Sequence, residues 1–338
     1  MNFGMKFWNN RGSGYFLMVT SILLMLISCT SREYRTIDGF TQGTTYHIAY
    51  SDEAEVPLDE MVEHLLARID SSLSVYNKES IVSKVNRGED VEIDTLFMNV
   101  FNKSLEINKI SDGLFDVSAS PVFNVWGFGF KNRESVTREK IDSARSLSGM
   151  DKFRIEGMKV VKSITGAELN FNAIAQGYSA DVIASHFDKR GVKNYLIEIG
   201  GEIFCKGVNP KGKRWSVGID KPIDGNNIQG EDIQDVLLMQ NRGLATSGNY
   251  RKFYEEDGEK FSHSINPITG YPARNSLLSA TVTAPDAMTA DAYATWFMVA
   301  GLEKAIEIIE SNPDIEGYLI YSRDGILNVY KSKGINLR

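Results

Sequence analysis

Hydrophobic residues recur at helical spacing in several stretches of the chain. After Pro57, apolar residues return every three or four positions up to Leu73, which is typical of a helix with one buried face. A second stretch of this kind covers residues 96–107 and should end near Asp112. Further helices are expected over the ranges 138–148, 177–190, 287–300 and 303–310.

Short apolar runs bounded by Gly, Asn or Asp predict strands between these helices. They cover the ranges 45–50, 195–199, 215–219, 236–239, 280–284, 318–321 and 327–330. Strands and helices follow one another without the regular rhythm of a doubly wound parallel sheet. We therefore predict an α+β fold with antiparallel pairing.

The N-terminal segment has the pattern of an export signal. Lys6 and Arg11 precede an apolar run over residues 15–27, which is too short to span a bilayer comfortably. The run ends in Leu-Ile-Ser-Cys at Cys29 and resembles a bacterial lipobox, in which cleavage leaves a lipidated cysteine at the new N-terminus. The alternative is an uncleaved signal anchor. The boundaries expected are 1–28 for the signal peptide, 29–36 for a tether and 37–335 for the folded domain.

Composition narrows the class of protein. Of the 338 residues, 42% are hydrophobic and 24% are charged, as in an ordinary folded protein. The net charge of −7 argues against nucleic-acid binding. Only Cys29 and Cys205 are cysteines, so a lipid on Cys29 would leave no disulfide framework. Cys205 is expected to be a small buried hydrophobic residue.

Several common catalytic and binding motifs are absent from the sequence. There is no GxGxxG after a strand, no GxxxxGK[ST], no HExxH and no paired CxxC. The GxSxG motif of serine hydrolases is also missing. With four histidines in the chain, a zinc site is not expected.

Five segments carry small and polar residues in places where a plain core would not have them. They are 43–46; 112–121 with 126–129; 170–178 with Asp181; 200–202 with 245–250; and 263–272 with 289–295. Each alone has an ordinary explanation, such as a turn or a helix end.

Asp291 and Thr295 stand out within the last segment. They lie four positions apart on an expected helix, so both should point to one face of it. The helix is otherwise apolar, and an unpaired carboxylate is costly to bury there. One explanation is an acidic residue that complements the helix dipole near its first turn. The other is a site for a hard cation, because carboxylate and hydroxyl oxygens suit Mg²⁺.

Taken together and in this order, the five segments resemble the ApbE-type FAD:protein FMN transferases, also called thiamine-biosynthesis lipoproteins. The resemblance covers about residues 35–330. It implies an ApbE-like, T-fold-related α+β domain, with two lobes and FAD in the cleft between them. It also implies a Mg²⁺-dependent enzyme that cleaves FAD, attaches FMN to a Thr or Ser hydroxyl of a target protein through a phosphoester bond, and releases AMP.

The resemblance assigns roles to individual residues. The Mg²⁺ ligands fall on the carbonyl of Ala173, the carboxylate of Asp291 and the hydroxyl of Thr295. His263 and Asp291 are both candidates for the base that activates the acceptor hydroxyl. The FAD contacts fall on Gln42, Tyr76, Val117, Ser118, Ala119, Asn170, Gln176 and Ile265. The chain departs from the commonest family residues at Gln42, Asn170, Gln176 and Asn266, and keeps the two metal-binding side chains.

The expected partners follow from the same resemblance. They are FAD and a redox protein with an acceptor motif of the form Asp-(Ser/Thr)-x-Ala-Thr. Residues 291–295 look close to that motif but lack the Ser or Thr after Asp, so they are interpreted as the metal site. A lipid on Cys29 would hold the protein at the outer face of the cytoplasmic membrane. The alternatives are an FAD pyrophosphatase, a non-catalytic flavin-binding lipoprotein and a solute-binding lipoprotein.

Overall fold

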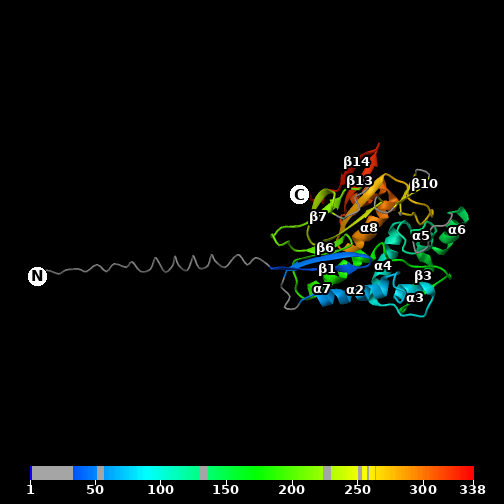
Figure 1. The fold of residues 1–338 in the computed structure, drawn as a ribbon, viewed down its shortest axis with the longest axis horizontal. Coiled ribbons are helices and arrows are strands. Elements are labelled where there is room, and N and C mark those ends of the chain that lie inside the picture. The colour runs from blue at the N-terminus through cyan, green and yellow to red at the C-terminus, as the bar shows by residue number, and fades with distance from the viewer. Residues whose placement is uncertain are drawn as a thin grey trace. The chain divides into compact units, whose positions relative to one another are not determined.

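The computed structural model describes residues 1, 33–51, 57–128, 136–223, 230–249, 253–256, 259–262 and 264–338 (Figure 1). Cys29 and almost all of the expected signal peptide lie outside the described residues. Residues Tyr34–Arg338 form one compact unit. The division into two lobes stays a prediction. None of the described helices is long and apolar enough to cross a membrane.

The largest sheet of this unit is antiparallel and has eight strands. Every pair of neighbouring strands in it is antiparallel. The α+β fold with antiparallel pairing that the sequence predicts is therefore confirmed. From one edge to the other the strands are β1 (Tyr34–Thr41), β2 (Thr44–Ser51), β5 (Tyr195–Ile199), β6 (Glu202–Lys206), β9 (Arg242–Gly248), β12 (Leu277–Ala284), β13 (Glu316–Arg323) and β14 (Ile326–Lys331).

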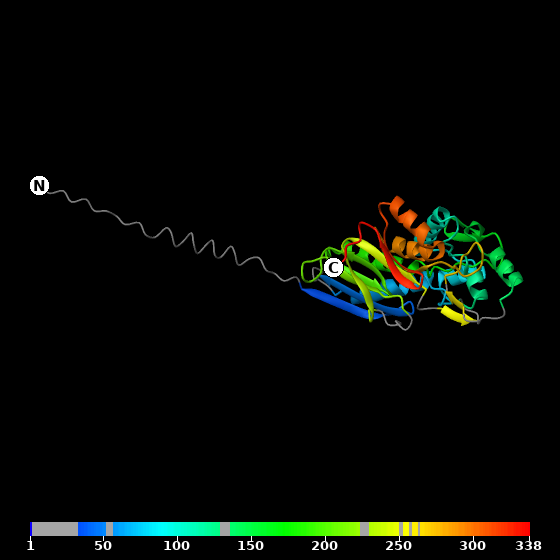
Figure 2. The same cartoon turned by 90° about the horizontal axis from the view of Figure 1, so that it is seen from above.

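Two central helices cover one face of the sheet. The helix α7 (Ala175–Lys189) packs on β5 and β6, and α8 (Ala287–Ala300) packs on β9 and β12. The two helices also pack on each other, and their buried residues belong to the main hydrophobic core. Figure 2 shows the orange helices on one side of the blue, green and red strands.

The other helices extend this layer. The helix α2 (Asp59–Leu73) packs on α7, α4 (Thr95–Ile110) packs on α8, and α9 (Leu302–Ser311) packs on β13. The shorter ones are α3 (Ile81–Arg87), α5 (Ser120–Val125), α6 (Arg138–Leu147) and the 3₁₀ helix Met150–Lys152. The six helices expected from the sequence are all present within a few residues of their predicted bounds.

A second, smaller core lies on the opposite face of the sheet. The hairpin of β7 (Trp215–Asp220) and β8 (Ile233–Met239) supplies one side of it, and buried residues of β6, β9 and β13 supply the other. Cys205 is fully buried in this core, as the sequence predicts. The chain end also reaches it, because Arg338 N donates to Val236 O at 2.9 Å. Two more hairpins are β3 (Phe153–Glu156) with β4 (Lys159–Lys162), and β10 (Phe253–Glu256) with β11 (Glu259–Ser262).

Candidate active site

The first polar segment reaches the start of α7. Gln42 and Gly43 form the turn between β1 and β2 with left-handed backbone angles, φ +49° and +76°. The Gln42 Nε2 amide donates to the hydroxyl of Ser179 on α7 at 2.7 Å. On the neighbouring turn, a Cβ at Gly200 would lie 2.7 Å from Nε2 of Gln176. The structure therefore brings Gln42, Gln176 and the Gly-Gly turn together at one end of α7.

The loop before α7 joins the second and third segments. Asn170 N donates to Val117 O at 2.7 Å, and Ala119 forms a parallel bridge with Glu168. The Asn170 side chain closes the loop by accepting from Asn172 N at 3.0 Å. The Asn172 amide in turn donates to the hydroxyl of Tyr76 at 3.2 Å. Tyr76 is 70% exposed beside this loop, so a planar ligand could reach its ring.

Other predicted FAD contacts have buried side chains. Val117, Ser118 and Ala119 are 4%, 0% and 0% exposed, and the Ser118 hydroxyl donates to Asp116 and accepts from Gly149 N. Ile265 is 1% exposed and packs in a small core beside Trp126. At these four positions the backbone is what a ligand could contact.

The fifth segment closes around the second. Trp126 Nε1 donates to Gly270 O at 2.7 Å, and its ring lies edge-on to Tyr271. On the same loop, Ile268 lies 3.8 Å from a Cβ built on Gly113. His263, the other candidate base, lies outside the described residues.

The helix α8 presents Asp291 to α7. Its N-cap is Asp286, whose side chain accepts from Thr289 N at 2.7 Å. Asp291 lies further along the helix and accepts from Gly177 N on α7 at 3.1 Å. Capping the helix is therefore the role of Asp286. The explanation of Asp291 as an acidic residue placed for the helix dipole is not supported.

The hydrogen bond from Gly177 connects Asp291 to the first turn of α7. Gly177 is the third residue of this helix, so its N–H is one of the first N–H groups that have no carbonyl acceptor within the helix. It donates to Asp291 Oδ2, and within the described residues no hydrogen bond reaches Ala173 O, two residues before the helix. A carbonyl oxygen without a hydrogen bond from the described residues thus lies just before the helix that contacts Asp291.

The Asp291 carboxylate is buried between α7 and α8. Asp291 is 5% exposed. Burial raises the pKa of its carboxyl group, and the hydrogen bond from Gly177 N lowers that pKa. Thr295, one turn further along α8, has its hydroxyl 3.4 Å from that of Ser247 on β9. In the described part of the chain, no three His, Cys, Asp or Glu side chains gather to hold a metal ion. A metal at Asp291 would therefore depend on one carboxylate and on uncharged oxygens.

Three residues near Asp291 and Thr295 belong to the five polar segments but were assigned no role from the sequence. Gly177 supplies the hydrogen bond to Asp291, Ser247 faces Thr295, and Asp181 contacts the first turn of α8. Asp181 could have been singled out by its spacing, because it lies four residues after Gly177 on a largely apolar helix.

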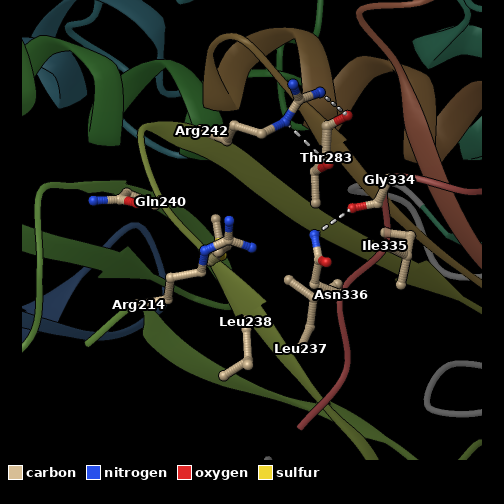
Figure 3. A pocket seen from close by; sticks show the side chains of 10 residues that line it. Arg214, Leu237, Leu238, Gln240, Arg242, Thr283, Gly334, Ile335 and Asn336 are labelled. Carbon is tan, nitrogen blue, oxygen red and sulfur yellow. Dashed lines mark hydrogen bonds between the residues drawn. The ribbon is translucent and has the colours of Figure 1, made fainter.

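A cavity of about 200 Å³ lies elsewhere, beside the β7–β8 hairpin (Figure 3). Its lining includes Arg214, Leu237 and Asn336, together with Arg242, which donates to Thr283 O at 3.2 Å. None of the predicted site residues lines this cavity. It is separate from the site around Asp291.

Comparisons with known proteins show the family of the chain. The ApbE family model matches residues 42–319. FAD:protein FMN transferase from Haemophilus influenzae is 34% identical, and the match covers 91% of this chain and 92% of that protein. The protein of the same name from Vibrio cholerae is also 34% identical over 88% of this chain and 91% of its own length.

Solved structures give the same result. Flavin transferase ApbE from Vibrio cholerae has a TM-score of 0.80 and 33% identity, covering 89% of this chain and 98% of that one. The apo form of Pseudomonas stutzeri flavinyl transferase ApbE has a TM-score of 0.80 and 29% identity, covering 89% and 95%. The chain belongs to the ApbE family.

Proposed function

We propose that this protein transfers FMN from FAD to a Thr or Ser hydroxyl of a target protein and releases AMP. The similar proteins from Haemophilus influenzae and Vibrio cholerae carry the name FAD:protein FMN transferase and match almost their full lengths. Within this chain, the observation that carries the proposal is the buried Asp291 carboxylate, which accepts from Gly177 N in the first turn of α7, shortly after the Ala173 carbonyl.

The donor atoms fit a Mg²⁺ ion. Asp291 offers a carboxylate that accepts one hydrogen bond from the described residues, Ala173 offers a carbonyl that accepts none, and Thr295 offers a hydroxyl. All are hard oxygen ligands, and Mg²⁺ in proteins commonly shares its shell between a few such ligands, water and phosphate. When bound, Mg²⁺ would neutralise negative charge on the pyrophosphate of FAD.

The residues around the metal-binding atoms would hold FAD. Tyr76 offers an exposed ring for stacking, and the loop that it shares with Asn170 and Asn172 carries amide groups for hydrogen bonds. Gln42 and Gln176 lie at the same end of α7 and add two more amides. Uncharged amides can bind phosphate oxygens and carbonyl groups without adding charge to the site.

The reaction exchanges a phosphoanhydride bond for a phosphoester bond. The acceptor oxygen forms a bond to the phosphorus of the FMN half, and the bond from that phosphorus to the bridging oxygen breaks. AMP leaves with the bridging oxygen, and the acceptor hydroxyl loses its proton to a base. His263 and Asp291 are the two candidates for this base.

We also propose that a lipid on Cys29 holds the enzyme at the outer face of the cytoplasmic membrane. The support is the apolar run over residues 15–27 followed by the lipobox-like sequence. The targets would then be exported or membrane-bound redox proteins that carry an Asp-(Ser/Thr)-x-Ala-Thr segment.

Intact-mass spectrometry of a target protein tests the proposed function. The chain without residues 1–29 is mixed with FAD, Mg²⁺ and a protein carrying Asp-Ser-x-Ala-Thr. The target should gain the mass of FMN less one water, and a target whose acceptor Thr is replaced by Ala should not. Free FMN and AMP with an unmodified target would instead support a pyrophosphatase. No consumption of FAD would support a flavin-binding or solute-binding lipoprotein.

His263→Ala and Asp291→Ala divide the roles in the same assay. Loss of transfer with unchanged Mn²⁺ binding in His263→Ala would assign the base to His263. Loss of both transfer and Mn²⁺ binding in Asp291→Ala would assign the metal to Asp291.

A further inference from the structure

The contact between α7 and α8 contains a second buried carboxylate, Asp181. Its Oδ1 accepts from Ala287 N and its Oδ2 accepts from Met288 N, both at 2.8 Å. These are the first two N–H groups of α8, which have no acceptor inside their own helix. One side chain of α7 thus holds the first turn of α8 through both carboxylate oxygens.

Asp286 and Asp181 share the capping of α8. Asp286 satisfies Thr289 N with its side chain and Ala290 N with its carbonyl, at 2.7 and 3.2 Å. Asp181 supplies acceptors for the two N–H groups before these, and one of them belongs to the fully buried Ala287. What Asp181 adds is a connection between two helices.

That connection reaches the metal-binding side chain. Ala287 and Asp291 are four residues apart and share one face of α8. On α7, Gly177 and Asp181 are also four residues apart, and Gly177 N donates to Asp291. Gly177 of α7 therefore contacts Asp291 of α8. Asp181, one turn further along α7, contacts Ala287, one turn earlier on α8.

The helices are as close as their backbones allow at this contact. A Cβ on Gly177 would lie 2.3 Å from Ala287 O and 2.9 Å from the Cβ of Asp291. Contacts of that length are sterically forbidden, so Gly177 sets the spacing and Asp181 sets where α8 begins along α7. A shift of α8 at Ala287 would move Asp291 relative to the Ala173 carbonyl, which precedes α7.

The arrangement carries an electrostatic cost. Burial raises the pKa of Asp181, and the nearby Asp286 and Asp291 raise it further, while the two backbone hydrogen bonds lower it. The groups facing it from α8 are therefore two carboxyl groups and two N–H donors. A contact that served only to pack two helices could avoid this repulsion with an apolar pair.

We infer that Asp181 is a positioning residue for the metal site, and that it fixes the Asp291 carboxylate against the Ala173 carbonyl by holding the first turn of α8. The inference rests on the proposed function, which supplies the metal. It predicts that moving the Asp181 oxygens weakens metal binding in the absence of FAD.

Calorimetric titration with Mn²⁺, without FAD, tests this inference. Asp181→Asn keeps the size of the side chain but turns an N–H₂ group toward one of the two α8 amides. Asp181→Glu keeps the charge and both oxygens but moves them by one methylene group. Both variants should raise the Mn²⁺ Kd at least about tenfold, as loss of an outer-shell partner commonly does. The Glu variant separates position from charge.

Asp286→Asn is the matched control. It removes a carboxylate from the same helix end, but not from the α7–α8 contact. Its Mn²⁺ Kd should stay within about twofold of the unchanged protein, because Asn caps a helix about as well as Asp and leaves the Asp181 contact in place. Melting curves show that each variant is folded, and Asp181→Glu serves if Asp181→Asn is not.

Three results would overturn the inference. They are an unchanged Kd in both Asp181 variants, an equal loss of affinity in Asp286→Asn, and full affinity in Asp181→Glu, which would show that charge alone matters. Failure of the unchanged protein to bind Mn²⁺ would contradict the proposed metal site itself, and is recognised before any variant is compared.

Discussion

Asp291 and Cys205 show how burial sets the chemistry of single residues. Both are almost inaccessible to water, and burial raises the pKa of each. Asp291 accepts a hydrogen bond from Gly177 N at the first turn of α7, whereas Cys205 lies among apolar residues of the smaller core. The same physical effect therefore marks a candidate functional residue in one place and an inert residue in the other.

Asp291→Asn should separate metal binding from stability. Asn can still accept the hydrogen bond from Gly177 N, and it removes a buried negative charge that no Lys, Arg or His among the described residues pairs with. Without metal, its melting temperature should equal or exceed that of the unchanged protein. Mn²⁺ at about one hundred times its Kd should stabilise the unchanged protein by about 2.7 kcal/mol and the variant not at all. Calorimetric melting with and without Mn²⁺ measures both, and equal stabilisation of both proteins would remove Asp291 from the metal site.

Cys205 should be unreactive in the folded protein. Burial raises the pKa of its thiol to about 12, so thiolate is scarce over pH 7 to 9. Because the folded pKa is raised, the stability linked to the neutral thiol is complete below the unfolded pKa of about 8.5 and is lost only as the pH rises toward 12. A chain beginning at residue 30 contains this single cysteine. Ellman's reagent at pH 8 should label it in urea and leave it unlabelled in buffer; rapid labelling of the folded chain would contradict its burial.

At the scale of the elements, the sequence predicts what its periodicity encodes. The helices α2, α4, α7, α8 and α9 each have an apolar face or are apolar throughout, and all were expected. The strand β1 was not, because its residues are mostly exposed and Ile37 is the one fully buried hydrophobic residue in it. The strand β9 was also missed, because its small residues Ala245, Thr246 and Ser247 look like a loop until α8 is placed against them.

The close contact of α7 and α8 makes a prediction about Gly177. In Gly177→Ala the new Cβ meets the Ala287 carbonyl, so the helices must move apart and the unfolding free energy should fall by about 3 kcal/mol. Gly191→Ala is the control, because it follows α7 with φ +78° and a Cβ there meets nothing within 4 Å. That control should cost about 1 kcal/mol, from backbone strain alone. Urea unfolding compares the two, and an equal loss would show that α7 and α8 are not packed as closely as described.

At the scale of the whole molecule, five segments spread along the chain meet around α7. From the sequence, these segments are identified as parts of one site only through their resemblance to a family. The pattern within one segment does not predict which other segments it contacts. Contacts such as Gln42 with Ser179 and Asn170 with Val117 depend on the order of strands in the sheet. The hydrogen bond from Gly177 N to Asp291 likewise could be found only in the structure.

The apolar run and lipobox-like sequence before Cys29 predict that the protein is anchored to a membrane. In cells, the unchanged protein should incorporate radiolabelled palmitate and sediment with membranes, because cleavage before Cys29 would expose the acylated cysteine. Cys29→Ser should lose the label. Transfer activity measured with purified, lipid-free enzyme should be the same for both sequences. Retention of the palmitate label in Cys29→Ser would contradict the proposed anchor.

Anomalous diffraction from crystals grown with FAD and Mn²⁺ would locate the metal. We expect one strong Mn²⁺ peak within coordination distance of the Ala173 carbonyl, the Asp291 carboxylate and the Thr295 hydroxyl, and no such peak in crystals of Asp291→Asn. A peak at another place in crystals of an active enzyme, or a peak that persists in Asp291→Asn, would contradict the proposed metal site.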